Sequence, residues 1–168
     1  MKSSSRQEVQ KYTKDEWLVP MNERISTTEE GETEYEYEIV IVEADSANEA
    51  VRNAKLKQIS EYDTSNAVNS FYLQGKHMWL PLEQRKNMRQ SLIALKAEGI
   101  ETITYWDGIV PITMPVAQFE AIMDAVEVYA LQCFNTTAQH KANVMTMSDM
   151  AEMLAYNHTD GYPSPLEF

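Results

Sequence analysis

The sequence predicts an α+β fold, in which antiparallel β-hairpins pack against a small set of α-helices and an acidic β-hairpin lies near the N-terminus. Three observations carry this prediction. Several stretches contain strand-forming residues, or alternate between two kinds of side chain, beside a turn that contains glycine. This is the pattern of a β-hairpin. Other stretches repeat apolar residues every three or four positions, as amphipathic helices do. Apolar residues make up 43% of the 168 positions, which is enough for a buried core.

The N-terminal quarter is predicted to be separate from the rest. Residues 1–45 are expected to form an arm and an acidic hairpin for docking or oligomerisation, and residues 46–168 a compact domain. Residues 1–13 are polar and unpatterned, so we expect an arm that is mobile or is ordered by a partner. Residues 16–42 are expected to form a hairpin with its turn at Gly31.

The second strand of this hairpin has two different faces. One face carries Thr33, Tyr35, Tyr37, Ile39 and Ile41. The other face carries Glu32, Glu34, Glu36 and Glu38, and it becomes apolar at Val40 and Val42. We therefore expect both faces to be covered at the end of this strand.

A helix is predicted over residues 47–61. Ser46 and Glu49 match a capping box, in which a hydroxyl and a carboxylate three residues apart bind backbone N–H groups. The apolar stripe is thin and consists of Ala47, Ala50, Val51, Ala54 and Ile59. The buried face of this helix is therefore expected to be modest.

A second hairpin is predicted over residues 70–80, with its turn at Gln74 and Gly75. A two-residue loop pairs Tyr72 with His77. One face then carries Phe71, Leu73, Met78 and Leu80. The other face carries Tyr72, His77 and Trp79. A helix follows, with Pro81 near its start, Gly99 past its end and a core stripe of Met88, Leu92 and Leu95.

A third hairpin is indicated by Asp107-Gly108, because this dipeptide favours a type I′ turn. The predicted register pairs Trp106 with Ile109, Tyr105 with Val110 and Ile103 with Ile112. One face then carries Ile103, Tyr105, Val110 and Ile112, and the other carries Thr102, Thr104, Trp106 and Pro111. Pro111 has no N–H group, so its strand is expected to lie at an edge or to be interrupted.

The C-terminal third is predicted to be helical. Over residues 115–135, apolar residues recur at intervals of three and four, at Phe119, Ile122, Val126, Tyr129 and Cys133. Shorter helices are predicted over residues 137–146 and 148–156, the latter capped by Ser148. The residues after 156 are expected to form a loop and an extended tail.

Cys133 and His140 are the most obvious candidates for catalysis. On one continuous helix they would lie on the same side but about 10.5 Å apart along the axis. A thiol and its base need hydrogen-bond contact, and no third orienting residue is apparent. A helix break at Asn135 could bring them closer, but Cys133 falls on the apolar stripe, where cysteine acts as a small hydrophobe. We therefore expect Cys133 to be a core residue.

Other chemistry has weak support in the sequence. The three histidines and one cysteine show no paired zinc-ligand spacing, and the five glycines form no phosphate-binding loop, so no metal or cofactor is predicted. The net charge of −12 opposes binding to nucleic acid or to an anionic membrane. No apolar run is long enough to span a bilayer, and residues 1–17 lack a signal-peptide core.

Two surfaces are candidate binding sites. The glutamate row could bind a cation or a basic partner, although a solvated strand face is the simpler interpretation. The face of Tyr72, His77 and Trp79 could be covered by the protein's own elements, contact another protein, or bind a sugar. The same three alternatives apply to Trp106, and we take all four residues as candidate protein-contact residues.

The region from about residue 55 to residue 168 resembles an uncharacterised C-terminal domain of tailed phages and prophages, common among those that infect Bacteroides-type gut bacteria. The resemblance lies in three stretches, which are SNAVNSFYLQGKHMWLPLEQRKNMRQSL (65–92), ETITYWDGIVPITMPVAQFEAIMDAVEVYALQCFNTTAQHKANV (101–144) and YNHTDGYPSPLEF (156–168). The first 45 residues resemble the glutamate-rich hairpins that precede this domain in some relatives. Members of the family look like parts of tail-fibre, baseplate or fibre-assembly modules, so the resemblance implies a virion appendage or assembly role. The family has no established activity, so the resemblance assigns no functional residue.

Three functions therefore compete. The first is a non-enzymatic structural component of a tailed-phage virion. Such a fibre, appendage or adaptor subunit of the tail, baseplate or head fibre would be made in the host cytoplasm and carried in the particle. It would bind other virion proteins and itself, as a dimer or trimer. The second is a tail-fibre assembly chaperone that leaves the particle. The third is a glycan hydrolase, which requires two nearby carboxylates from among Asp107, Glu120, Asp124 and Glu127.

Overall fold

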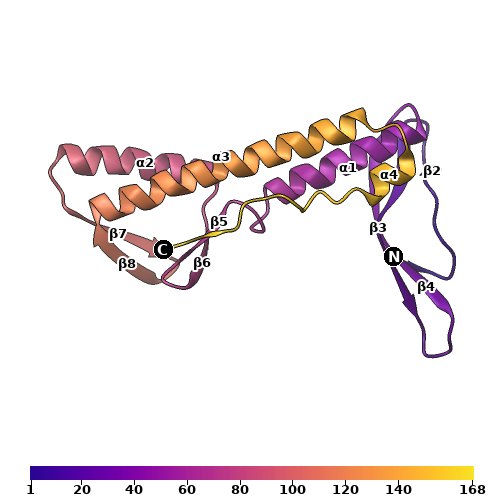
Figure 1. The fold of residues 1–168 in the computed structure, drawn as a ribbon, viewed down its shortest axis with the longest axis horizontal. Coiled ribbons are helices and arrows are strands. Elements are labelled where there is room, and N and C mark those ends of the chain that lie inside the picture. The colour runs from indigo at the N-terminus through magenta and orange to yellow at the C-terminus, as the bar shows by residue number, and fades with distance from the viewer. The chain divides into compact units, whose positions relative to one another are not determined.

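The computed structural model describes residues 1–168 except the side chain of Asp107, and it confirms an α+β fold of hairpins and helices. The chain divides into two compact units. Unit 1 contains residues 1–62 and 137–160, and unit 2 contains residues 63–136 and 161–168. The long helix α3 (Val116–Thr146) supplies residues to both units (Figure 1).

The boundary predicted at residue 45 does not coincide with this division. Helix α1 (Ala47–Asp63) packs Val51, Ala54 and Ile59 into one core with Val19 and Met21 of the N-terminal sheet. The acidic hairpin and the first helix therefore share a hydrophobic core and belong to the same compact unit.

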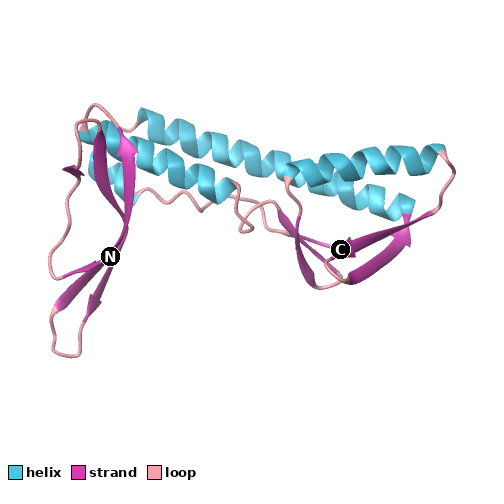
Figure 2. Cartoon of the chain, turned by 180° about the vertical axis from the view of Figure 1, so that it is seen from behind, coloured by secondary structure: helices cyan, strands magenta, loops and turns pink.

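Unit 1 contains a four-stranded antiparallel sheet in the order β1-β4-β3-β2. The predicted hairpin is confirmed as β3 (Glu16–Thr27) and β4 (Thr33–Glu43). A bulge interrupts their register between Met21 and Arg24, where Asn22 has φ of 54°. The half of the hairpin beyond this bulge projects away from the helices of unit 1 (Figures 1 and 2).

Only one face of the end of β4 is covered. Val40 is buried and Val42 packs against the same core, whereas Ile41 is 47% exposed. The prediction that both faces would be covered is therefore wrong, because this sheet packs a single face against the α1 core.

Residues 1–13 pair with the rest of unit 1, so they do not form the mobile or partner-ordered arm that the sequence predicts. β1 (Lys2–Ser3) pairs with β4, and β2 (Gln10–Lys11) pairs with β3. Between these strands, the Gln7 backbone N–H donates to the hydroxyl of the buried Tyr37 at 3.0 Å. Ion pairs of Lys2 with Glu34 and of Arg6 with Glu23 add to this attachment. The Arg6 hydrogen bond also lowers the pKa of the Glu23 carboxyl group.

The start of helix α1 follows the prediction. The Ser46 hydroxyl accepts a hydrogen bond from the Glu49 backbone N–H at 3.3 Å. The Glu49 carboxylate accepts one from the Asp45 N–H at 2.9 Å, one residue before the donor of a standard capping box. The short helix α4 (Met150–Ala155) is capped by Asp149, whose carboxylate accepts a hydrogen bond from the Glu152 backbone N–H. The cap predicted at Ser148 is therefore wrong by one residue.

Unit 2 contains a three-stranded sheet in the order β6-β5-β9. β5 (Ser70–Leu73) and β6 (Lys76–Trp79) form the predicted hairpin in the predicted register, with Tyr72 opposite His77. β9 (Leu166–Glu167) adds to β5 in parallel, so part of the predicted extended tail is a strand. The predicted inner face is confirmed, since Phe71, Leu73, Met78 and Leu80 are all buried.

The third hairpin has the predicted faces but a different register. β7 (Thr102–Asp107) and β8 (Val110–Pro115) pair Tyr105 with Ile112 and Trp106 with Pro111. The turn residues are Gly108, with φ of 60°, and Ile109. Glycine at the first turn position suits a type II′ turn instead of the predicted type I′, and this moves the loop by one residue. Both strands are edges of a two-stranded sheet, as Pro111 requires.

Two helices complete unit 2. Helix α2 (Leu82–Ala97) follows Pro81 and ends before Gly99, as predicted. α3 begins directly after Pro115 and continues to Thr146, so the break predicted near Asn135 is wrong. The core joins α2, α3 and both hairpins through Leu92, Phe119, Met123, Phe71 and Met114. In both views the two hairpins of unit 2 lie on the same side of these helices (Figures 1 and 2).

Candidate functional site

The face formed by Tyr72, His77 and Trp79 is at the surface. Tyr72 is 38% exposed, Trp79 is 40% exposed and His77 is also exposed. The Tyr72 and His77 rings meet edge to face with centroids 5.3 Å apart. The interpretation that the protein's own elements cover this face is therefore wrong, and contact with another protein and binding of a sugar remain as alternatives.

Strand β9 extends this face. Glu167 lies opposite Tyr72 in the parallel ladder. Tyr72, Gly75, Glu167 and Phe168 line a shallow hollow of about 340 Å³. The sequence did not indicate this arrangement, because a two-residue strand has no periodicity that could reveal it.

The tip of the β7–β8 hairpin is a second apolar surface in unit 2. Trp106 is 61% exposed, Ile109 is 92% exposed and Val110 is 46% exposed. Trp106 shares a face with Pro111, as the sequence predicts, but it lies opposite Pro111 instead of Ile109. Asp107 lies beside these residues in the chain, but its side chain is outside the part of the structure that is described.

Helix α3 carries an apolar surface that the sequence analysis missed. Val128, Leu131 and Phe134 are each about 60% exposed, while Val126, Tyr129 and Cys133 on the same helix are buried. These exposed residues recur every three positions, which is a helical spacing. The signal was present in the sequence, but the longer buried stripe on the other side obscured it.

Cys133 and His140 do not form a catalytic pair. Cys133 is fully buried, as predicted for a core residue. Both ring nitrogens of His140 have partners of their own in unit 1. Nε2 lies 2.9 Å from the Asp160 carbonyl oxygen, and Nδ1 lies 2.6 Å from the Tyr156 hydroxyl. A carbonyl oxygen only accepts, so Nε2 donates and, in the neutral ring, Nδ1 accepts from Tyr156.

His140 belongs to a polar cluster that holds residues 147–160 in place. Asn143 donates to the same Tyr156 hydroxyl at 3.0 Å. Three side chains of α1 donate to backbone carbonyl oxygens of this segment. Asn48 donates to Ser148 and Arg52 donates to Met147. Lys55 donates to both Leu154 and Tyr156. These donors lie at helical spacing on one side of α1, and together they attach the backbone of residues 147–156 to that helix.

Burial changes the ionisation of two groups near this cluster. Desolvation lowers the pKa of the Lys55 ammonium group. Burial, the charge of Lys55 and the charge of His140 together lower the pKa of His158. His158 also packs edge to face against Tyr62, with ring centroids 5.6 Å apart. Both pKa shifts disfavour the charged form, as expected for cationic side chains that burial removes from water.

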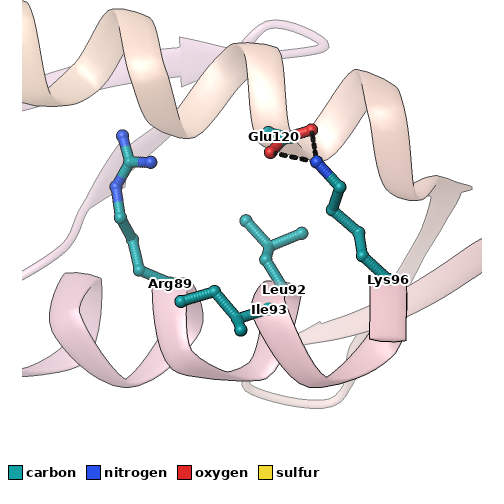
Figure 3. Close-up of a pocket in the computed structure, with 5 residues that line it drawn as sticks. All are labelled: Arg89, Leu92, Ile93, Lys96 and Glu120. Carbon is teal, nitrogen blue, oxygen red and sulfur yellow. Dashed lines mark hydrogen bonds and ion pairs between the residues drawn. The ribbon is translucent and has the colours of Figure 1, made fainter. Parts of the chain in front are cut away.

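Three of the four carboxylates considered for glycan hydrolysis form ion pairs between α2 and α3, and the side chain of the fourth, Asp107, lies outside the described residues. Glu120 contacts Lys96 at 2.7 Å, Asp124 contacts Arg89 at 2.7 Å and Glu127 contacts Arg85 at 3.2 Å. Figure 3 shows Arg89 and Lys96 extending from α2 beside Leu92 and Ile93, around a hollow of about 300 Å³. These ion pairs link the two helices.

The glutamate row is largely solvated, as expected. Glu32, Glu36 and Glu38 are exposed, and Glu34 is partly exposed in its ion pair with Lys2. The Glu38 carboxylate accepts a hydrogen bond from the Asn22 side chain. Within the described residues, no three side chains of histidine, cysteine, aspartate or glutamate are grouped as a metal site requires.

Comparison of the chain with protein-family models, with curated proteins and with solved structures found no match in any of the three. None of the helices in the described part of the chain is both long enough and apolar enough to cross a bilayer.

Proposed function

We propose that this protein is a non-enzymatic structural component of a tailed-phage virion, a small fibre, appendage or adaptor subunit that acts through protein–protein contacts. One observation carries the contact function: unit 2 presents Tyr72, Trp79 and Trp106 at its surface on two hairpins. Large aromatic residues are enriched in the centres of protein interfaces, because they bury much area at little cost in conformational entropy.

The assignment to a phage particle is motivated by the resemblance of residues 55–168 to a phage appendage domain. The exposed residues of both hairpins lie inside the stretches that carry this resemblance. Its partners would be other virion proteins and further copies of itself, in a dimer or trimer. A net charge of −12 favours such partners over nucleic acid or an anionic membrane.

Mass spectrometry of gradient-purified particles of the encoding phage tests this proposal. We expect the protein at a fixed ratio to the major capsid protein, and the copy number would indicate its location. Absence from particles, together with abundant protein in the lysate of infected cells, would contradict a virion role. That outcome would support a tail-fibre assembly chaperone that does not remain in the particle.

A further inference from the structure

The segment Gly161–Phe168 completes unit 2 from a distant part of the sequence. Residues 137–160, which precede it, belong to unit 1, whereas Leu166 and Glu167 pair with Phe71 and Tyr72 of β5. The Phe168 N–H donates to the Tyr72 carbonyl oxygen at 2.9 Å, and the Gln74 N–H donates to the Phe168 carbonyl oxygen at 2.8 Å. The Phe71 and Phe168 rings meet edge to face at 5.9 Å.

Side chains of this segment add to the same attachment. Leu166 packs against the core of unit 2, whereas Phe168 remains 40% exposed. The strand has only two ladder pairs, and short peripheral strands open locally at much lower cost than the whole fold. The β5 edge therefore accepts one short strand, and the chain itself shows which sequence pairs with it.

The residues leading to β9 favour an extended approach. Gly161 has φ of 78°, which a glycine adopts without strain. Pro163 and Pro165 follow, and proline fixes φ and disfavours a helical residue before it. The four residues 162–165 span about 12 Å in a polyproline-like conformation.

We propose that β9 is exchangeable, so that Leu166–Phe168 of one copy docks on the β5 edge of a second copy and links the two chains. The hydrogen bonds and the Phe71–Phe168 contact are the same within one chain or between two. Exchange of an identical element therefore costs mainly the entropy of association. A high local concentration of copies shifts this balance toward the linked form.

This inference gives a mechanism for the self-association included in the proposed function, and it rests on that function only for its biological use. Engineered cysteines in the purified full-length chain test it separately. Cys133→Ala first removes the natural thiol. One chain then carries Tyr72→Cys, and a second chain with a different mass tag carries Glu167→Cys. Neighbouring strands lie about 4.8 Å apart, which is within the range of disulfide Cα separations.

The two chains are refolded together at high concentration and oxidised. We expect a reducible heterodimer on a denaturing gel. Its yield should be at least about fivefold above the yield from a mixture of Tyr72→Cys with Glu98→Cys, a control whose cysteine does not pair with Tyr72 in the β5–β9 ladder. A chain that carries both Tyr72→Cys and Glu167→Cys reports whether the β5–β9 register forms at all. An intrachain bond without heterodimer would overturn the exchange. Failure of both bonds would overturn the pairing itself, and neither result depends on whether the protein occurs in virions.

Discussion

Phe119 and Trp106 are large aromatic residues in unit 2 with opposite environments. Phe119 is 4% exposed and stacks on Tyr105 with ring centroids 6.5 Å apart, whereas Trp106 is 61% exposed. We expect Phe119→Ala to lower the free energy of unfolding by about 3–5 kcal/mol. Trp106→Ala should change it by about 0.5 kcal/mol or less. Urea denaturation measures both, and the reverse order would contradict the facing of the β7–β8 hairpin.

His158 gives unit 1 a predicted dependence on pH. Its pKa in the folded state lies below the ordinary value of 6.5, so the unfolded chain takes up the proton first as the pH falls. Stability should therefore decrease as the pH falls through about 6.5 and level off below the folded pKa. Urea denaturation between about pH 5 and pH 8 measures this slope.

Two variants isolate the contribution of His158. His158→Gln should reduce the slope, because the titrating group is removed. His77→Gln, which changes an exposed histidine in unit 2, is the matched comparison. Equal slopes in all three proteins would show that His158 is not the group responsible.

At the scale of residues, burial of long periodic stretches could be predicted from sequence. The stripe from Phe119 to Cys133 is buried throughout, and Tyr72 and Trp79 were correctly placed on the side opposite Phe71. What the sequence left open was whether another element covers that side, because periodicity defines faces but not their neighbours. The polar partners of Lys55 and His140 come from residues 147–160, which are distant from Lys55 in sequence, so no local pattern could reveal them.

At the scale of elements, helix α3 is the main correction. The sequence Asn135-Thr136-Thr137 has low helix propensity and suggested a break, but the helix continues through it. Thr137 is 3% exposed and the Thr136 hydroxyl donates to the Gln132 carbonyl oxygen. Tertiary packing and local hydrogen bonds therefore outweigh a weak propensity.

Proline substitution tests the continuity of α3. Asn135→Pro removes an internal hydrogen bond and should cost about 3 kcal/mol or more of unfolding free energy. Asn135→Ala is the matched control and should be neutral or slightly stabilising, because Asn135 is exposed and alanine favours a helix. Urea denaturation compares the two variants, and equal stability would indicate that the helix is interrupted at this position.

The hairpins show how much turn chemistry alone can predict. At Gln74-Gly75 both turn residues have positive φ, and the predicted register is correct. At Asp107-Gly108-Ile109 two turn types compete, and the dipeptide rule selected the wrong one. Strands β1, β2 and β9 have only two residues each, so their pairing depends on where the rest of the chain places them.

At the scale of the whole molecule, the division into two units could not be predicted from composition. Residues 1–45 carry 12 acidic and 5 basic residues, which suggested a separate element. The acidic side chains mark the solvated part of that hairpin near its turn. Val19, Met21 and Val40, at the other end of the hairpin, join a core with α1 and α4. The apolar residues define the unit because their burial provides the main stabilising free energy.

The central claim is that the exposed aromatic face of unit 2 attaches this protein to a phage particle. The most direct measurement is the ratio of the protein to the major capsid protein in purified particles that carry Tyr72→Ser/Trp79→Ser. Ile93→Ser is the matched control, because Ile93 is 63% exposed on α2 and lies outside that face. We predict at least a tenfold loss for the double variant and none for the control, with both proteins folded by circular dichroism. Equal incorporation of the two variants would contradict the claim.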